Sequence, residues 1–255
     1  MRREPFRLLD LFSGIGGFSL GLERSRAFKT VAFCEIEPFC QRVLKKHWPN
    51  VPCYEDIRTL TATRLAADGI AVDAICGGFP CQDISVAGKG AGLAGERSGL
   101  WREYARLIGE LKERQKIEYV LLENVAALLG RGMGDVLRDL AALGFDAEWH
   151  CIPASAVGLP HIRDRVWIVA YPREERGQGK LKSALPWLYG VPWGENERRA
   201  ADFMGRSDLY DPRLCRASDG IPDRAHRVAS CGNAVVPQIP ELIGRAIAQA
   251  EGMTI

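Results

Sequence analysis

The sequence predicts an α/β fold, a doubly wound and mainly parallel sheet with helices on both faces. Three observations predict it. Short apolar runs alternate with segments of helical spacing, and glycines stand where two of these runs end. In addition, 47% of the 255 residues are hydrophobic, which is enough for one large core or for a core with a small appended lobe.

Five apolar runs predict strands: FRLLDLF, TVAFCEI, VDAICGGF, EYVLLENV and RVWIVAY. Between them, apolar residues at helical spacing predict helices over 37–48, 59–67, 99–114 and 133–143. A last helix follows Pro237 and Pro240. Its apolar face would pack back on the first domain, and consists of Ile239, Leu242, Ile243, Ala246, Ile247 and Ala250.

The composition changes after Tyr171, where prolines, glycines and charges replace regular apolar spacing. This change predicts a domain boundary. We expect one domain of residues 1–171, completed by 230–255, and a small irregular domain of residues 172–229.

Charge and cysteine content exclude several classes of protein. The net charge is only +2, so a nucleic-acid surface would have to be local, at Lys89 with Arg97 and Arg102, at Arg163 with Arg165, or within 198–227. Eight cysteines without a CxxC pair disfavour a disulfide scaffold and a zinc ribbon, so we expect reduced thiols and no metal. No apolar stretch approaches about 20 residues and the start has no signal peptide, which predicts a cytosolic protein without a membrane partner.

The first apolar run ends in DLFSGIGGFSLGLE, with Gly14, Gly16 and Gly17 at the turn from strand to helix. Their spacing matches neither dinucleotide-binding nor P-loop glycines, which disfavours a phosphate site. Glu35 ends the second run, where a carboxylate can bind ribose hydroxyls, and Asp56 could accept a bond from an adenine amino group. Together these residues predict an adenosyl ligand without a pyrophosphate.

Cys81 follows the third strand run and could be a structural thiol, a redox or metal ligand, or a nucleophile. The next residues, DISVAGKGAGLAGERSG, contain five glycines and predict a loop that can move, which favours the nucleophile. Glu123 ends another strand run and could act as an acid beside the thiol. Arg163 and Arg165 alternate in an extended segment, where two cations suit a phosphate or a carbonyl oxygen.

The motifs FSGIGG, CEIE, EDI, GGFPCQDIS, ENV, HIRDRV and GNAVVP occur in this order and resemble the successive motifs of DNA (cytosine-5)-methyltransferases. The resemblance covers nearly the whole chain except about 172–212. It implies an S-adenosylmethionine-dependent, Rossmann-like catalytic domain, with residues 172–229 as a small target-recognition domain. It also implies that S-adenosylmethionine is held by Phe12, Ser13, Gly14, Gly17, Glu35, Ile36, Asp56, Ile57, Pro80, Leu100, Asn233 and Val235.

The resemblance further implies a covalent mechanism on a cytosine flipped out of the duplex. The thiolate of Cys81 would attack C6 of the base, and Glu123 would bind N3 and the exocyclic amine. Arg165 would lie near O2 of the base, and Arg163 near the thiol and a phosphate. The expected DNA contacts are Gln82, Ser85, Lys89 and Arg97.

The chain departs from the family pattern at His161, where glutamine is usual, and in its short target-recognition region. The expected partner is double-stranded DNA, bound by a monomer that acts with a cognate restriction endonuclease or as an orphan or phage enzyme. Two other functions remain open: a catalytically silent DNA-binding relative, which the presence of the four catalytic residues argues against, and a tRNA cytosine-5 methyltransferase.

Overall fold

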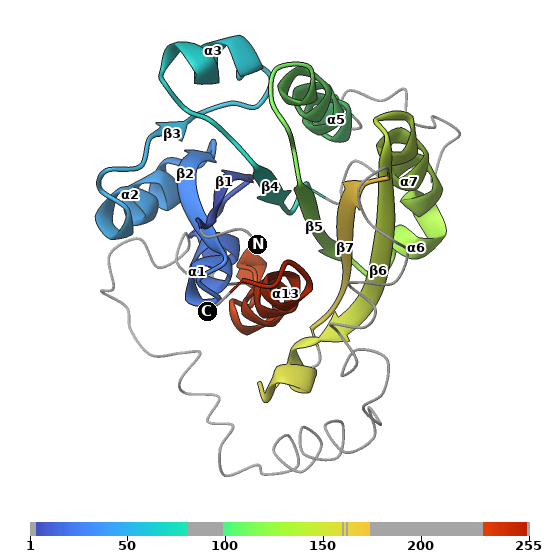
Figure 1. Cartoon of the computed structure of the whole chain (residues 1–255). Helices are drawn as coiled ribbons and strands as arrows, with labels where there is room; N and C mark the ends of the chain where they lie inside the picture. The colour runs from blue at the N-terminus through green and yellow to red at the C-terminus, as the bar shows by residue number, and fades with distance from the viewer. Residues whose placement is uncertain (1–3, 81–98, 160, 162, 174–231, 254–255) are drawn as a thin grey trace.

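The computed structural model describes residues 4–80, 99–159, 161, 163–173 and 232–253, which form one seven-stranded sheet in the order β3-β2-β1-β4-β5-β7-β6 (Figure 1). The α/β prediction is confirmed. The strands are β1 (Phe6–Leu11), β2 (Phe28–Cys34), β3 (Cys53–Tyr54), β4 (Ala74–Gly77), β5 (Tyr119–Val125), β6 (Phe145–Pro153) and β7 (Asp164–Pro172).

The helices predicted between the strands are also confirmed, as α2, α3, α5 and α7. Proline at the first position of α2 and a basic last turn suit the two ends of that helix. The side chain of Thr61 caps α3 by accepting from the backbone N–H of Arg64 at 3.1 Å. The helices are α1 (Gly17–Arg24), α2 (Pro38–His47), α3 (Ala62–Ala67), α5 (Gly99–Lys112), α6 (Leu128–Arg131), α7 (Met133–Ala142) and α13 (Gln238–Ala250), with a 3-10 turn at Ala154–Val157.

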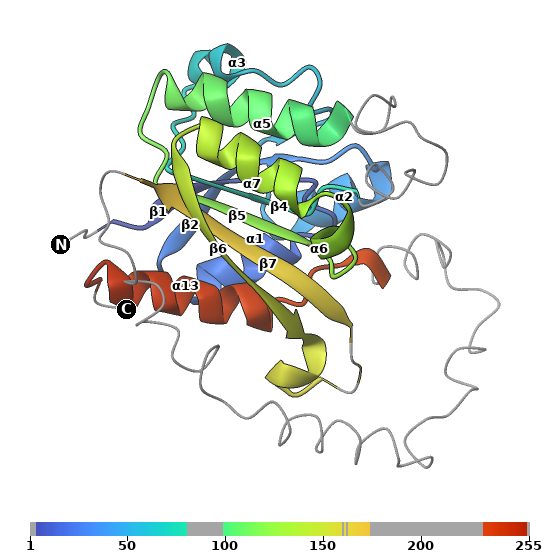
Figure 2. The same cartoon turned by 90° about the vertical axis from the view of Figure 1, so that its right-hand side faces the viewer.

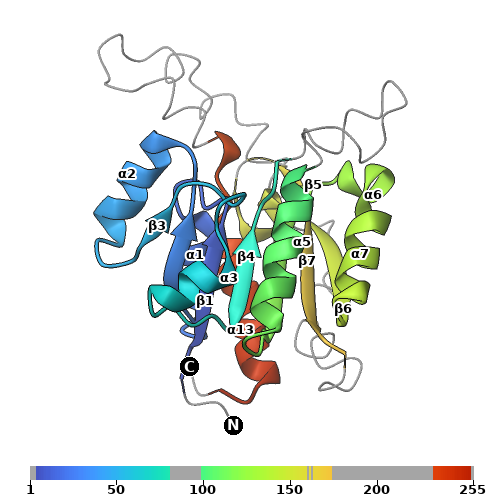
Figure 3. The ribbon, with the colours of Figure 1, turned by 90° about the horizontal axis from the view of Figure 1, so that it is seen from above.

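The sheet is buried on both faces, which explains why its central strands are continuous apolar runs. Leu9 and Leu11 of β1 belong to the core beneath α3, α5 and α7, whereas Phe6 and Leu8 belong to the core beneath α1 and α13. Figure 2 shows these helices on opposite sides of the sheet, and Figure 3 shows α5 lying along β4 and β5.

The sheet is mainly parallel, as predicted, because β3, β2, β1, β4 and β5 pair in parallel and only β7 and β6 do not. Strand β1 pairs in parallel with β2 and β4, and β4 pairs in parallel with β5, but β7 runs antiparallel between β5 and β6. The sequence did not predict β6. This edge strand is mostly half-buried and therefore lacks a continuous apolar run.

The C-terminal helix packs on the first domain, as predicted, and glycines bring it close to α1. A Cβ at Gly21 would lie 2.1 Å from the carbonyl oxygen of Pro237, and one at Gly17 would lie 2.4 Å from that of Val235. The segment before α13 therefore contacts the beginning of the helix that follows the glycine-rich turn.

The small target-recognition domain stays a prediction, because residues 174–231 lie outside the described part of the chain. Within the described ranges, no helix combines the length and apolar character needed to cross a membrane. The same ranges contain no group of three or more histidine, cysteine or acidic side chains that could hold a metal ion.

Candidate active site

A pocket of about 470 Å³ opens at the ends of β1 and β2, the edge of an open α/β sheet where ligands bind. Its described lining combines apolar side chains with four carboxylates and the guanidinium of Arg58. Pockets that hold small ligands have volumes of about 300–1,000 Å³. The lining residues are Phe12, Cys34, Glu35, Ile36, Glu55, Asp56, Ile57, Arg58, Pro80, Gly99, Leu100 and Glu103.

The turn after β1 shapes one wall of this pocket. Phe12 and Gly14 both have positive φ, 52° and 54°, which places the backbone in the left-handed region that favours glycine. The hydroxyl of Ser13 donates to the carbonyl of Asp10 at 2.6 Å, and the N–H of Gly16 donates to the carbonyl of Ser13 at 2.8 Å. These two hydrogen bonds hold the turn in a tight conformation, which Gly14 can adopt because it has no side chain.

Glu35 is buried between this turn and the start of α2. Its carboxylate accepts from the N–H of Gly14 at 2.6 Å and from the N–H of Glu37 at 2.8 Å, one bond to each oxygen. Because a carboxylate has about four acceptor positions, Glu35 can still accept from two hydroxyl groups of a ligand. This geometry suits a ribose.

Asp56 is held by its neighbour Arg58. The guanidinium of Arg58 donates to both carboxylate oxygens, at 2.6 to 3.0 Å, and its backbone N–H donates to one of them. These hydrogen bonds lower the pKa of Asp56. Asp56 is therefore a permanent anion at the pocket wall and can act only as an acceptor.

Asp10 lies beneath the glycine-rich turn and is fully buried. It accepts from the hydroxyl of Ser19 at 2.6 Å, and so connects the end of β1 to α1. Burial raises the pKa of Asp10 to about 7, because the charged form is poorly solvated there.

A second charged group lies where β5 and β7 pair. The Nε of Arg165 is 3.0 Å from Oε1 of Glu123, and both side chains are largely buried. Burial raises the pKa of Glu123, although the positive charges of Arg165 and Arg163 oppose this shift. The structure thus brings together three of the four predicted catalytic residues.

The chain that leads to Cys81 is attached to the same strand. A Cβ at Gly78 would lie 3.0 Å from Oε2 of Glu123, so only glycine leaves this carboxylate uncrowded. The side-chain amide of Asn124 donates to the carbonyl of Phe79 at 3.0 Å. Pro80, the residue before Cys81, lines the pocket. Phe79, the residue before Pro80, is bonded to β5.

Arg163 connects this edge to the C-terminal segment, since its guanidinium donates to the carbonyl of Gly232. The segment GNAVVP, residues 232–237, therefore lies between Arg163 on one side and α1 on the other. Asn233 and Val235 are nevertheless absent from the pocket lining described above, and Val235 contacts Gly17 instead.

The predicted cofactor residues fall into two groups. Seven line the pocket, while Ser13, Gly14, Gly17 and Val235 shape or support the surrounding backbone, and Asn233 is exposed outside the described lining. Cys81 and the predicted DNA contacts Gln82, Ser85, Lys89 and Arg97 lie outside the described residues and stay predictions.

Sequence reasoning missed five residues of the pocket lining, of which all but Glu103 directly adjoin a predicted residue. They are Cys34, Glu55, Arg58, Gly99 and Glu103.

Residues 6–196 match the model of the C-5 cytosine-specific DNA methylase family. The chain belongs to this family. It is 35% identical over 168 residues to the type II methyltransferase M2.BsuMI of Bacillus subtilis, covering 64% of this chain and 41% of the relative. It is 32% identical over 176 residues to M.DsaV of Dactylococcopsis salina, covering 67% and 47%. The chain thus spans less than half the length of these two relatives.

Solved structures support the fold of this family member. The structure of the Entamoeba histolytica methyltransferase EhMeth aligns over 97% of this chain and 99% of its own, with a TM-score of 0.61 and 13% sequence identity. At this identity the likeness establishes the shared fold alone.

Proposed function

We propose that this protein transfers a methyl group from S-adenosylmethionine to C5 of a flipped-out cytosine in a specific sequence of double-stranded DNA. One observation carries the proposal beyond family membership. The short segment before Cys81 contacts Glu123, is bonded to Asn124 and then lines the 470 Å³ pocket at Pro80. A nucleophile placed there has an acid on one side and a ligand pocket on the other.

The lining of the pocket fits S-adenosylmethionine. Ile36, Ile57 and Leu100 provide apolar surface for an adenine ring, and Glu35 has acceptor capacity for ribose hydroxyls. Among the described lining residues, the guanidinium belongs to Arg58 and is paired with Asp56, which suits a ligand without a pyrophosphate. When bound, S-adenosylmethionine supplies a methyl group on a positively charged sulfur.

Cytosine C5 is too weak a nucleophile to accept this methyl group unless the ring gains electrons. In the proposed step, the thiolate of Cys81 forms a bond to C6, and the ring electrons move toward N3. Glu123 donates its proton to N3, which requires the protonated acid, and burial favours this form by raising the pKa of Glu123. C5 would then take the methyl group as the bond from that methyl group to sulfur breaks and its electron pair stays on sulfur. Loss of the C5 proton to water would expel the thiolate of Cys81, and N3 would return its proton to Glu123.

The two arginines assist this acid from different positions. Arg165 holds the carboxyl group of Glu123 in a defined orientation through the 3.0 Å contact and would bind O2 of the base. Arg163 is bonded to the C-terminal segment and, in the proposal, also lies near the thiol and a DNA phosphate. Arg163 therefore ties the edge that carries Glu123 to the segment that contacts α1.

The proposal includes the parts of the chain that carry DNA recognition. Residues 1–171 with 230–255 would bind the cofactor and carry out the reaction, and residues 172–229 would read the target. Gln82, Ser85, Lys89 and Arg97 would contact DNA. Acting as a monomer on DNA, with or without a cognate restriction endonuclease, the protein would work in the cytosol of a bacterium or of a phage-infected host.

The test combines methyl transfer with sequencing. Purified protein, labelled S-adenosylmethionine and unmethylated duplex DNA should give labelled 5-methylcytosine, and bisulfite sequencing should find it in one sequence context. Cys81→Ser should abolish transfer while S-adenosylmethionine still binds, because the serine hydroxyl is a far weaker nucleophile than a thiolate at neutral pH.

Three results would contradict the proposal or its mechanism. Transfer to tRNA but not to DNA would assign the tRNA reaction, and cofactor binding without transfer to either acceptor would indicate a silent relative. Transfer at the wild-type rate by Cys81→Ser would overturn the covalent mechanism.

A further inference from the structure

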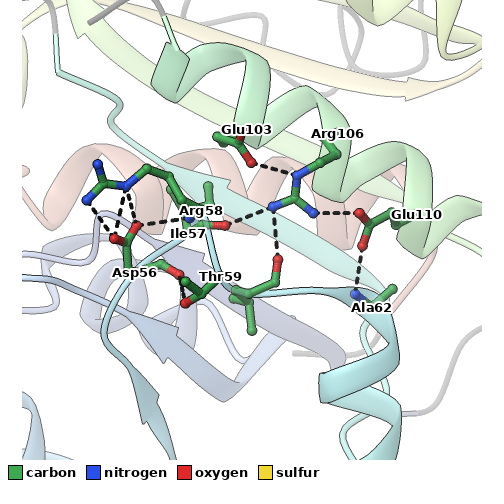
Figure 4. Close-up of polar contacts among 9 residues, drawn as sticks. Asp56, Ile57, Arg58, Thr59, Ala62, Glu103, Arg106 and Glu110 are labelled. Carbon is green, nitrogen blue, oxygen red and sulfur yellow. Dashed lines mark hydrogen bonds and ion pairs between the residues drawn. The ribbon is translucent and has the colours of Figure 1, made fainter. Parts of the chain in front are cut away.

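A second polar cluster, centred on Arg106, joins two walls of the pocket. Arg106 lies on α5, one helical turn after the pocket residue Glu103. Its guanidinium donates to Glu103 at 2.6 Å and to Glu110 at 2.5 Å, on either side along the same helix (Figure 4).

Arg106 also reaches across to the opposite pocket wall. Its second terminal nitrogen donates to the backbone carbonyls of Ile57, at 2.8 Å, and Leu60, at 2.9 Å. Ile57 is a pocket residue, and Glu110 accepts from the N–H of Ala62 at 3.0 Å. Figure 4 shows the guanidinium between the helix and this segment.

The two walls that Arg106 joins come from separate parts of the chain. Residues 55–58 form one wall, and the start of α5, with Gly99, Leu100 and Glu103, forms another. The bonds from Ala62 to Glu110 and from Arg114 to Thr63 also join α5 to this part of the chain, but they lie beyond the pocket lining, whereas Arg106 bonds to the lining residues Ile57 and Glu103. A planar guanidinium, with donors in a fixed fork, can satisfy two carboxylates and two carbonyls at once, which the single ammonium of lysine cannot do.

We infer that Arg106 is a positioning residue for the cofactor: it holds the segment around Asp56 and Ile57 at a fixed distance from α5 and so presets the width of the adenosyl pocket. The inference rests on the proposed function, since it assumes that S-adenosylmethionine occupies this pocket. Arg106 touches neither the cofactor nor the base, and its effect is on binding and not on the chemical step. Preorganised sites bind more tightly because less ordering is needed on association.

The test is the affinity for S-adenosylmethionine of full-length Arg106→Lys, measured by titration calorimetry, together with steady-state kinetics. We expect the Kd and the KM for the cofactor to rise about tenfold, which is about 1.4 kcal/mol, with kcat at saturating cofactor within twofold of wild type. The KM for DNA should not change. Arg138→Lys is the matched control, because Arg138 pairs with Asp135 and Asp139 on α7, away from the pocket lining, and its Kd should equal that of wild type.

A milder variant protects the test against loss of folding. Glu110→Gln keeps Arg106 but weakens one of its contacts, and it should raise the Kd about threefold. If Arg106→Lys folds and binds like wild type, or if it fails to fold and Glu110→Gln binds like wild type, the inference is wrong. It is also wrong if kcat falls in parallel with affinity and with the unfolding temperature, the pattern of a merely structural residue. If wild-type protein itself binds no S-adenosylmethionine, the proposed function fails instead.

Discussion

The two ends of the candidate site are built in different ways. The pocket between the turn after β1 and the start of α5 is shaped by backbone hydrogen bonds and apolar side chains. Its carboxylates Glu35, Asp56 and Glu103 are bonded to nearby N–H groups or arginine. The edge between β5 and β7 instead places one buried carboxyl group beside two guanidinium groups. The pocket is suited to holding a ligand, and the edge to moving a proton.

The largest effect is expected at that edge. Glu123→Gln should lower kcat by about 10⁴, the upper range for a general acid, because the amide cannot give up a proton to N3. The Kd for S-adenosylmethionine should stay within twofold of wild type. Radiolabelled methyl transfer and calorimetry measure the two quantities, and parallel loss of both would contradict the division between pocket and edge.

The pocket end has its own buried carboxyl, Asp10, which should affect stability and not the proton transfer. Because the pKa of Asp10 is raised to about 7, the folded protein keeps this proton while the unfolded chain loses it above about pH 4. The contribution of Asp10 to stability is therefore complete below pH 4 and lost as the pH rises to 7, a change of about 4 kcal/mol.

Asp10→Asn removes this titration while keeping an acceptor for Ser19. Urea unfolding at pH 4.5 and pH 8 should therefore show a smaller loss of stability for Asp10→Asn than for wild type. An equal loss in both proteins would show that Asp10 is ionised in the folded state.

Much of both ends could be predicted from the sequence, because their residues follow strand ends directly. Glu35 ends an apolar run, Glu123 ends another, and parallel strands bring such ends to one edge. Arg106 could not be predicted, because a single arginine on an amphipathic helix face resembles an ordinary surface residue. Its partners are backbone carbonyls almost 50 residues away in sequence.

The C-terminal segment was predicted only in outline. The apolar spacing of α13 indicates a helix that packs on the domain, and the structure confirms this. The close contact of Val235 with Gly17 requires that residue 17 has no Cβ. This requirement could not be predicted before the structure placed the segment before α13 against α1.

A smaller effect, about 30-fold, is expected at the ribose end of the pocket. Glu35→Ala should raise the Kd for S-adenosylmethionine by this factor, about 2 kcal/mol, since hydrogen bonds to a charged group contribute about 1.5–3 kcal/mol. The kcat at saturating cofactor should be close to that of wild type. Glu113→Ala, an exposed acid near the end of α5, is the control and should bind like wild type. A fall in kcat without a change in Kd would place Glu35 outside the cofactor site.

The smallest effect concerns the residue that joins the two ends. Asn124→Asp keeps the acceptor for the N–H of Val125 but removes the donor to the carbonyl of Phe79. We expect kcat to fall about tenfold, about 1.4 kcal/mol, because the segment before Cys81 loses its attachment to β5. Single-turnover methyl transfer measures this, and an unchanged rate would show that the bond does not position Cys81.

The central claim is that the edge performs covalent chemistry on cytosine while the pocket only holds the methyl donor. Duplex DNA in which 5-fluorocytosine replaces cytosine tests it most directly, because fluorine cannot leave C5 as a proton does and the enzyme stays attached. With saturating S-adenosylmethionine, wild type and Glu35→Ala should form an adduct that resists denaturing electrophoresis, and Glu123→Gln and Cys81→Ser should not. A wild-type enzyme that methylates DNA without forming this adduct, or an adduct formed at the wild-type rate by Glu123→Gln, would contradict the claim.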